Sequence, residues 1–410
     1  TPTKDWSGDV SFSYQVSDRT TPLTSTPNSI NLPGNTYQEF KNNYAIAALR
    51  SDGSVVSWGE YNKESYGGDS SSVDFDGPNN DLTVTQIFSA LRAFAALRSD
   101  GSVVTWGDSE YGGDSSSVDF DGASNNLTVS KIYSTEGAFA AIRSDGSVVS
   151  WGGYGGDSSS VDFDGANNDL TVSEIYSNSH AFAALRSDGS VVSWGLGSYG
   201  GDSSSVDFDG ASNNLSVSKI YSTERAFAAV RSDGSVVSWG ISAEGGDSSG
   251  VDFDGASNNL TVSQIASTKE AFAALRSDGS VVTWGNNSWG GDSSSIDFDG
   301  TNNDLNVSQI YSNEKAFAAV RSDGSVVTWG LSSHGGDSSS VDFDGASNNL
   351  TVSQIYSTSW GSKGAFAALR SDGSVVTWGN SEYGGDSSSV DFDGPNNDLT
   401  VSKIYSTGFA

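Results

Sequence analysis

The chain repeats one unit of about 45 residues eight times. The string RSDGSVV recurs at spacings of 48, 45, 43, 45, 45, 45 and 49 residues. A unit of this length cannot bury both faces of its own sheet, so neighbouring units have to stack on one another. The copies begin at Arg50, Arg98, Arg143, Arg186, Arg231, Arg276, Arg321 and Arg370.

Each unit is predicted to consist of strands. In the second unit AFAAL (93–97) is apolar throughout, which is typical of a strand buried on both faces, and SVVTW (102–106) follows as its hairpin partner. The Asp-Gly between them supplies the positive φ that a tight hairpin needs. LTVSKIY (127–133) alternates apolar and polar residues like a half-buried strand, and a fourth, shorter strand is expected within SSVDF (116–120). No segment has a sustained 3.6-residue period, so we expect no helix.

These units predict an all-β fold, a β-propeller of about eight, alternatively seven, repeats, with an open superhelix as a third arrangement. The small AFAA strand is expected to lie innermost, where only Ala and Gly fit. The chain carries eight complete hairpins but nine copies of the linking strand, and the surplus copy could complete the first blade. The repeated Trp is expected to fill the space between neighbouring units. Its copies are Trp58, Trp106, Trp151, Trp194, Trp239, Trp284, Trp329 and Trp378.

The run A-A-L-R-S-D-G-S-V-V-S-W-G resembles the repeat of the regulator of chromosome condensation family, over residues 44–410. The resemblance implies a seven-bladed β-propeller, which in bacterial members usually serves as an interaction platform. The family places a Gly-Gln-Leu-Gly type segment after the Trp-Gly, whereas this chain has Tyr-Gly-Gly-Asp or a variant and then an acidic insert. Nothing here matches the loops that carry the nucleotide-exchange activity of the eukaryotic founder, so that activity is not transferred.

Two domains are predicted, 1–34 and 35–410. The stretch DWSGDVSFSYQVSD (5–18) resembles the final strands of bacterial cadherin-like or immunoglobulin-like modules, and a linker rich in Thr, Pro and Ser follows. Such modules occur in long surface proteins. We therefore expect an extracellular or cell-surface location and a larger parent protein.

The composition restricts the partners of the chain. A formal net charge of −31 repels phosphate backbones, so nucleic-acid binding is not expected. The acidic surface suits bound cations, saline surroundings or a basic partner. There is no cysteine, which excludes disulfides and thiolate metal sites, and no apolar run of about 20 residues that would insert into a membrane.

The insert GGDSSSVDFDG recurs almost unchanged in all eight units and is the candidate metal site. Ser72, Asp74 and Asp76 alternate before Gly77, as in the first half of a calcium loop, although the later bidentate Glu of an EF-hand is missing. The alternative is a structural turn in which the carboxylates cap backbone amides. Calcium is the predicted cofactor. Its predicted ligands are Asp74, Asp76, Asp119, Asp121, Asp162, Asp164, Asp207, Asp209, Asp252, Asp254, Asp297, Asp299, Asp342, Asp344, Asp391 and Asp393.

Two short segments vary between units, one after each Trp-Gly and one just before each AFAA. Variable loops on an invariant frame are how a scaffold carries a binding surface. The aromatic residues there are predicted to bind a protein or glycan, with packing beneath the loops as the alternative. These residues are Tyr66, Tyr111, Tyr154, Tyr199, Trp289 and Tyr383.

The remaining titratable residues have simpler predicted roles. His180 and His334 occupy positions that differ from unit to unit, so we expect both at the surface. The Arg of each RSDG is expected to pair with the Asp of its own turn or with an acid of a neighbouring unit, or else to be solvated.

The resulting functional prediction is a non-enzymatic module for adhesion or cell-surface structure, with calcium as its predicted stabilising ion and self-assembly left open. The alternative is a secreted inhibitor that binds a protein through propeller loops. A carbohydrate-active enzyme is the remote alternative, because the Asp pair recurs in all eight units and enzymes seldom build eight equal sites.

Overall fold

The computed structural model describes residues 12–14, 23–25, 42–59 and 66–406, without 125, 211, 213, 258, 301, 303, 346–348, 361–362 and 394–398. The repeats are grouped into two larger compact bodies, divided in sequence between Ser160 and Val161. From here on, 'first unit' and 'second unit' mean these two bodies, and each 45-residue copy is called a repeat. Near the start of the chain, β1 (Phe12–Tyr14) pairs antiparallel with β2 (Leu23–Ser25). The remainder of the predicted module and linker at 1–34 lies outside the described residues, so that domain stays a prediction.

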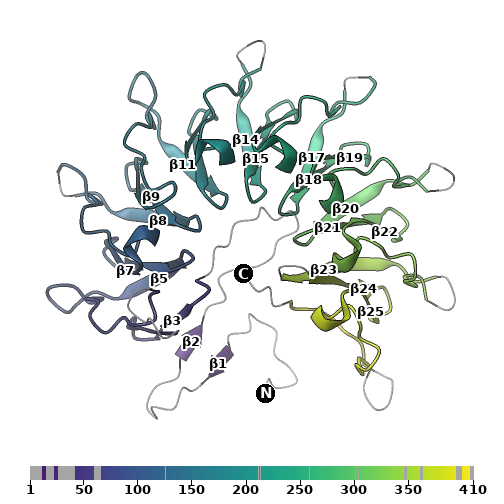
Figure 1. Ribbon diagram of the computed structural model, residues 1–410, viewed down its shortest axis with the longest axis horizontal. Coiled ribbons are helices and arrows are strands. Elements are labelled where there is room, and N and C mark those ends of the chain that lie inside the picture. The colour runs from purple at the N-terminus through teal and green to yellow at the C-terminus, as the bar shows by residue number, and fades with distance from the viewer. Residues whose placement is uncertain are drawn as a thin grey trace. The chain divides into compact units, whose positions relative to one another are not determined.

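Besides the β1–β2 pair, the first unit holds one two-stranded and two three-stranded antiparallel sheets, drawn in purple to blue in Figure 1. Their strands are β3 (Ala45–Leu49) and β4 (Val55–Gly59); β5 (Val84–Ser89), β6 (Ala93–Arg98) and β7 (Val103–Gly107); and β8 (Val129–Ser134), β9 (Ala138–Arg143) and β10 (Val148–Gly152).

The second unit holds five three-stranded antiparallel sheets that follow one another from teal to yellow in Figure 1. Their strands are β11 (Val172–Ser177), β12 (Ala181–Arg186) and β13 (Val191–Gly195); β14 (Val217–Ser222), β15 (Ala226–Arg231) and β16 (Val236–Gly240); β17 (Val262–Ser267), β18 (Ala271–Arg276) and β19 (Val281–Gly285); β20 (Val307–Ser312), β21 (Ala316–Arg321) and β22 (Val326–Gly330); and β23 (Val352–Trp360), β24 (Lys363–Arg370) and β25 (Val375–Gly379).

The order of strands within each sheet corrects one prediction. The AFAA strand is the middle strand of every three-stranded sheet, between the linking strand and the Trp strand, and so is not the innermost edge. Instead, linking strands of successive sheets are joined directly. The hydroxyl of Ser267 donates to the carbonyl of Ser222 at 2.8 Å, and that of Ser222 donates to the carbonyl of Ser177 at 2.9 Å.

Of the other local predictions for the repeat, the structure confirms the hairpin turn and contradicts the fourth strand. The SDG turn is confirmed: Gly279 has φ +84°, and its N–H donates to the carbonyl of Arg276 at 3.0 Å. The prediction of a strand in SSVDF is wrong, because these residues form turns and bends, with no strand, in the described copies. No α-helix occurs among the described residues, but a single 3-10 turn follows six of the Trp strands. These turns are η1 (Ser109–Tyr111), η2 (Gly197–Tyr199), η3 (Ser242–Glu244), η4 (Asn287–Trp289), η5 (Ser332–His334) and η6 (Ser381–Tyr383).

The core lies between consecutive sheets. Ala181 and Ala183, which are fully buried, face the next sheet and pack in one cluster with its Phe227 and Trp239. The same combination of an alanine face with a Phe–Trp face recurs at the other interfaces within each unit. The small side chains let the backbones approach closely, while the aromatic rings supply the buried area.

The repeated Trp is a core residue, as predicted, in every three-stranded sheet. Trp284 stacks on Phe272 of its own sheet, with ring centroids 5.0 Å apart. Its indole N–H donates to the carbonyl of Gly245, in the preceding repeat, at 3.0 Å. Trp58 in the two-stranded sheet is the exception, because 38% of it is exposed.

None of the helices in the described part of the chain has the length and apolar character needed to cross a bilayer. The number of blades in a closed ring, and the role of the surplus linking strand, remain predictions from the sequence. In the structure, residues 399–406 of that surplus copy have no strand assignment.

Candidate functional site

The acidic insert connects one repeat to the next. The Arg98 guanidinium donates to the carbonyls of Asp74 and Phe75, at 3.2 Å for Phe75, and to the Ser102 hydroxyl at 3.2 Å. Equivalent bonds to the preceding insert are made by Arg143, Arg231, Arg276, Arg321 and Arg370. The repeated Arg was expected to pair with a carboxylate or to be solvated; its hydrogen-bond acceptors in the insert are backbone carbonyls instead.

The aromatic residue of the insert completes this connection. Phe253 meets the Trp284 ring of the next sheet edge-on, with centroids 5.2 Å apart. Trp284 therefore contacts two Phe rings, one stacked and one edge-on, which are both favourable arrangements for aromatic quadrupoles. The VDFDG segment is thus a structural strap between repeats.

The carboxylates of the insert accept hydrogen bonds from their own loop. Asp74 Oδ1 accepts the N–H of Gly77 at 2.7 Å, and the same bond occurs in six further copies. Asp76 accepts from the Asn80 side-chain amide at 2.9 Å, which holds the pKa of Asp76 below its usual value. Both Asp side chains thus make the turn contacts of the alternative interpretation.

Calcium at the sixteen predicted Asp residues stays a prediction. Within the described residues, no three His, Cys, Asp or Glu side chains gather closely enough to hold a metal ion. A calcium ion needs six to eight oxygen ligands. The two carboxylates of one insert would therefore have to be joined by carbonyls, amide oxygens and water.

The two variable segments lie together at the end of each sheet opposite the RSDG hairpin. We call the residue directly before each Gly-Gly and the two residues directly before each AFAA the variable rim. In the second unit its members before Gly-Gly are Tyr199, Glu244, Trp289, His334 and Tyr383, and those before AFAA are Ser179, His180, Glu224, Arg225, Lys269, Glu270, Glu314, Lys315, Lys363 and Gly364.

The glycine after each 3-10 turn fixes the first of these positions. Gly290 has φ +100°, and a Cβ placed on it would lie 2.5 Å from the ring of Phe317 in the next sheet. Glycine is required for both reasons. The turn therefore ends against the core, and Trp289 is held directly above it.

A repeated Thr or Asn ties the two halves of the rim together. The Thr223 hydroxyl accepts the N–H of Ala226 at 3.0 Å and donates to the carbonyl of Glu244 at 3.0 Å. Asn178 does the same for Ala181 and for the carbonyl of Tyr199. Further copies of the bond to the turn are made by Thr268, Asn313 and Thr358. Sequence reasoning missed this residue, although the recurring IYST or IYSN was its signal.

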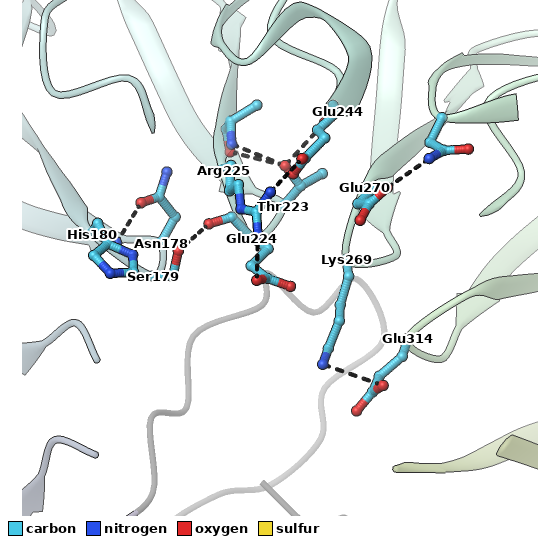
Figure 2. Close-up of polar contacts among 12 residues, drawn as sticks. Asn178, Ser179, His180, Thr223, Glu224, Arg225, Glu244, Lys269, Glu270 and Glu314 are labelled. Carbon is cyan, nitrogen blue, oxygen red and sulfur yellow. Dashed lines mark hydrogen bonds and ion pairs between the residues drawn. The ribbon is translucent and has the colours of Figure 1, made fainter. Parts of the chain in front are cut away.

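Backbone hydrogen bonds also link the rim of one sheet to that of the next. The N–H of Ser179 donates to the carbonyl of Glu224, that of Glu224 to Lys269, and that of Lys269 to Glu314, at 3.1, 2.7 and 2.8 Å. The side chains along this line therefore project from a hydrogen-bonded backbone, and Figure 2 shows how they lie.

In the first unit the rim is built around one cation. The Arg92 guanidinium lies 5.4, 5.2 and 4.9 Å from the ring centroids of Tyr44, Tyr66 and Tyr111. Tyr44 and Tyr66 stack on each other with centroids 4.7 Å apart. These are cation–π distances. Tyr66 and Tyr111, two of the predicted partner-binding residues, therefore already contact a cation of their own chain.

In the second unit charges of both signs alternate, as Figure 2 shows. Arg225 donates to Glu244 Oε1 at 3.0 Å, lies 3.6 Å from Glu224, and stands 5.3 Å from the Tyr199 ring. Lys269 pairs with Glu314 at 3.3 Å. Arg225 and Lys269 thus have acidic partners on the same line.

Beyond this line, Lys315 stands 4.6 Å from the centroid of Trp289, and Lys363 pairs with Glu382 near Tyr383. The Glu270 carboxylate accepts the side-chain amide of Asn286 at 2.6 Å. The rim of the second unit is therefore charged but locally balanced, in a chain of net charge −31.

Burial adjusts the titration of three rim residues. It raises the pKa of the Glu244 and Glu314 carboxyls, although Arg225 and Lys269 oppose the effect. Burial also lowers the pKa of His180, with help from the nearby positive charge of Arg225. All three shifts favour the neutral form of the side chain.

The predicted partner-binding aromatics occupy rim positions in each of the two units. Tyr66, Tyr111, Tyr199, Trp289 and Tyr383 are half-buried, while Tyr154 is exposed. Sequence reasoning identified the aromatic positions but missed the cations stacked on them, Arg92, Arg225 and Lys315. The prediction of a surface role is wrong for His334, which is fully buried because it ends the turn that rests on the next sheet.

Comparison with known proteins gives distant likenesses only. No protein-family model and no curated protein matches the chain. Among solved structures, Prp20p from Saccharomyces cerevisiae, which binds Gsp1p and histones, is 18% identical at a TM-score of 0.38 and covers 63% of this chain and 74% of its own. Human WBSCR16 is 17% identical at 0.36, covering 65% and 80%.

A third likeness is to the ectodomain of the receptor kinase CR4 from Physcomitrella patens. It is 15% identical at a TM-score of 0.35 and covers 78% of this chain and 80% of its own. At these identities and TM-scores, the description of the fold depends on the sheets of the chain itself.

Proposed function

We propose that the protein is a non-enzymatic binding module of the β-propeller type, which recognises a partner protein through its variable rim. The observation that carries this proposal is the division of each repeat into an invariant frame and two variable positions. Residues of the recurring frame hold those positions in place, as the hydrogen bonds of Thr223 and the close fit of Gly290 show. Varied side chains on a rigid support are the arrangement of a recognition surface.

The chemistry of the rim supports a protein partner. Tyr, Trp and Arg side chains are enriched at protein interfaces, and Tyr and Trp lose little conformational entropy on binding. The acidic inserts are less suitable, because their sequence hardly varies and their carboxylates and Phe are occupied within the chain. A glycan ligand is the alternative that the experiment below distinguishes.

The same proposal includes adhesion at an extracellular surface. Its support comes from the sequence: the resemblance of residues 5–18 to surface modules, and the strongly acidic charge. The acidic charge also predicts that attraction to a basic partner weakens as salt is added.

Calcium stabilisation is the further part of the proposal. A ligand that binds only the folded state adds RT ln(1 + [L]/Kd), about 2.7 kcal/mol at a hundredfold excess over Kd. We expect the melting temperature to rise with calcium and to fall with a chelator, and to change little with magnesium. An unchanged melting temperature after chelation would contradict a structural ion.

The rim is tested by binding to panels of purified cell-surface proteins and of glycans. The variant is Lys315→Ala with Trp289→Ala, which removes one cation–aromatic pair of the rim. The control is Lys219→Ala, because Lys219 stands 4.8 Å from the ring of Tyr221 at the opposite end of the sheet. We expect the rim variant alone to lose affinity for a protein. Binding to glycans only, or equal loss in both variants, would contradict the proposal.

A further inference from the structure

At several places on the rim the chain sets its own cation beside the aromatic residues of neighbouring repeats. The Arg92 guanidinium lies 5.2 Å from the ring centroid of Tyr66, in the preceding repeat, and 4.9 Å from that of Tyr111, in its own repeat. Arg225 likewise stands 5.3 Å from the ring of Tyr199, in the repeat before it. The rim residue before AFAA therefore supplies the cation for its aromatic neighbours.

Between Tyr111 and the next rim aromatic, Tyr154, the corresponding residue is Gly137, which has no side chain. A Cβ built on Gly137 would lie 3.9 Å from a ring atom of Tyr111 and 3.7 Å from a ring atom of Tyr154. Gly137 thus lies between two tyrosines, as Arg92 does. We call Tyr111, Gly137 and Tyr154 the Gly137 site, and all three belong to the first unit.

Neither the backbone nor the packing requires glycine at this position. The φ of Gly137 lies outside the left-handed region, and an added Cβ would meet its neighbours at ordinary van der Waals distances. Tyr154 is 60% exposed, whereas the five other predicted partner-binding aromatics are half-buried. The site therefore presents an aromatic surface to solvent at a place where a side chain of the chain itself could have stood.

Hydrogen bonds of the frame hold the site in this arrangement. The Thr135 hydroxyl accepts the N–H of Gly137 at 3.3 Å and donates to the carbonyl of Tyr154 at 3.3 Å. The carbonyl of Gly137 accepts the N–H of Gly153 at 2.8 Å. The backbones of the two halves of the site are thus fixed before a ligand arrives, which lowers the entropic cost of binding.

The charges beside the site favour a cationic ligand. Glu110 is exposed and directly precedes the first tyrosine of the site, and Glu136 directly precedes Gly137. Arg92 lies 3.9 Å from the Asp108 carboxylate, so a second guanidinium nearby does not meet an uncompensated positive charge. The formal charge of −31 on the whole chain also attracts cations.

We propose that the Gly137 site binds the guanidinium of an arginine side chain of the partner protein. This guanidinium would stand between Tyr111 and Tyr154, as Arg92 stands between Tyr66 and Tyr111. Arginine suits the site because its guanidinium is planar, weakly hydrated and able to stack on aromatic rings. The inference rests on the proposed recognition of a protein by the variable rim, and it names the side chain that the first unit recognises.

The test is a titration of the full chain, carrying NMR-labelled tyrosine rings, with the peptide acetyl-Gly-Arg-Gly-amide. The matched peptide has citrulline in place of arginine, which keeps the planar group but removes its charge. We expect saturable shifts of the Tyr111 and Tyr154 signals with the arginine peptide and no saturable shift with the citrulline peptide. No saturable shift with arginine, or an equal response to both peptides, overturns the proposal.

Three variants locate the binding. Gly137→Arg fills the site with a guanidinium of the chain itself and should abolish the response, whereas Gly250→Arg adds the same charge where a Cβ meets nothing within 4 Å and should respond like the wild type. Tyr154→Ala should weaken binding by about two- to thirtyfold, the range of one cation–aromatic contact. Because Tyr154 is exposed, this variant tests the site even if Gly137→Arg does not fold. Wild-type affinity in Tyr154→Ala overturns the proposal.

Failure of this inference differs from failure of the proposed function. A protein of the panel could bind the wild type and Gly137→Arg equally but lose affinity for the variant with Lys315→Ala and Trp289→Ala. That result would contradict the Gly137 site and support the rim. Loss of affinity for the protein in Gly137→Arg, with Gly250→Arg unchanged, is the result that we expect.

Discussion

The interfaces between sheets and the variable rim use the same residue types for different ends. At the interface Trp284 lies between two Phe rings and its N–H is satisfied by a carbonyl in the preceding repeat. At the rim Trp289 is half-buried under the ammonium of Lys315. The first arrangement recurs almost unchanged along the chain, and the second changes from repeat to repeat.

This difference shows where each repeat can accept variation. The interface must satisfy an indole N–H, an alanine face and a glycine φ together, so a change at one place leaves a cavity or a clash. The rim is held from below by backbone and by a Thr or Asn, so its side chains can differ without disturbing the frame. The predictions below are ordered from the interface to the rim.

The largest effect is expected for Phe272→Ala. The residue is fully buried and stacked on Trp284, so its truncation should cost about 3–5 kcal/mol of unfolding free energy. Trp289→Ala at the rim removes a larger but half-buried ring and should cost distinctly less. Chemical denaturation of both variants measures the contrast. Equal losses would show that the rim is part of the core.

Next is Gly290→Ala, which forces a left-handed residue and a Cβ against Phe317. Strain and overpacking together predict a loss of about 2–4 kcal/mol. Gly250→Ala is the matched control, because a Cβ there meets nothing within 4 Å. It should leave thermal stability unchanged or slightly raised. A tolerated Gly290→Ala would mean that the turn does not rest on the next sheet.

A smaller effect is expected for Arg321→Ala, which removes the bonds from β21 to the strap at Asp297 and Phe298. The freed carbonyls are near solvent, so we expect a loss of about 1–2 kcal/mol. Limited proteolysis should detect faster cleavage in the strap, and Arg321→Lys should restore little, because a single ammonium cannot reach all acceptors. Unchanged cleavage would show that these bonds do not hold the strap in place.

The smallest effect concerns pH and Glu244. Its pKa is raised in the folded state, so the folded protein holds this proton to higher pH than the unfolded chain. The stability associated with that proton is present at low pH and is lost as pH rises through the folded-state pKa. The stability of Glu244→Gln relative to the wild type should therefore increase as the pH rises from acidic to neutral. Thermal melts of both proteins at several pH values measure this difference. A difference in melting temperature that does not change with pH would contradict the prediction.

Much of the fold could be predicted from the repeat alone. The SDG hairpin and the buried Trp depend on local chemistry that is visible in one repeat. The position of AFAA in the sheet could not be, because a strand buried on both faces suits either a middle or an inner place. The expected SSVDF strand failed because Asp and Ser in this segment bond to their own backbone instead.

The rim was predicted only in part for a similar reason. The variable aromatics stand out in an alignment of the repeats. Their pairing with Arg92, Arg225 and Lys315 does not, because it joins positions in different loops and in neighbouring repeats. His334 was assigned to the surface for the same reason: its burial is set by the next sheet.

Hydrogen–deuterium exchange of the protein with its tightest partner from the protein panel tests the central claim most directly. Binding through the rim predicts protection in the 3-10 turns at 197–200, 242–245 and 287–290 and in the segments before AFAA, with the straps at 252–255 and 297–300 unchanged. Protection confined to the straps, with the turns exchanging as in the free protein, would contradict the account.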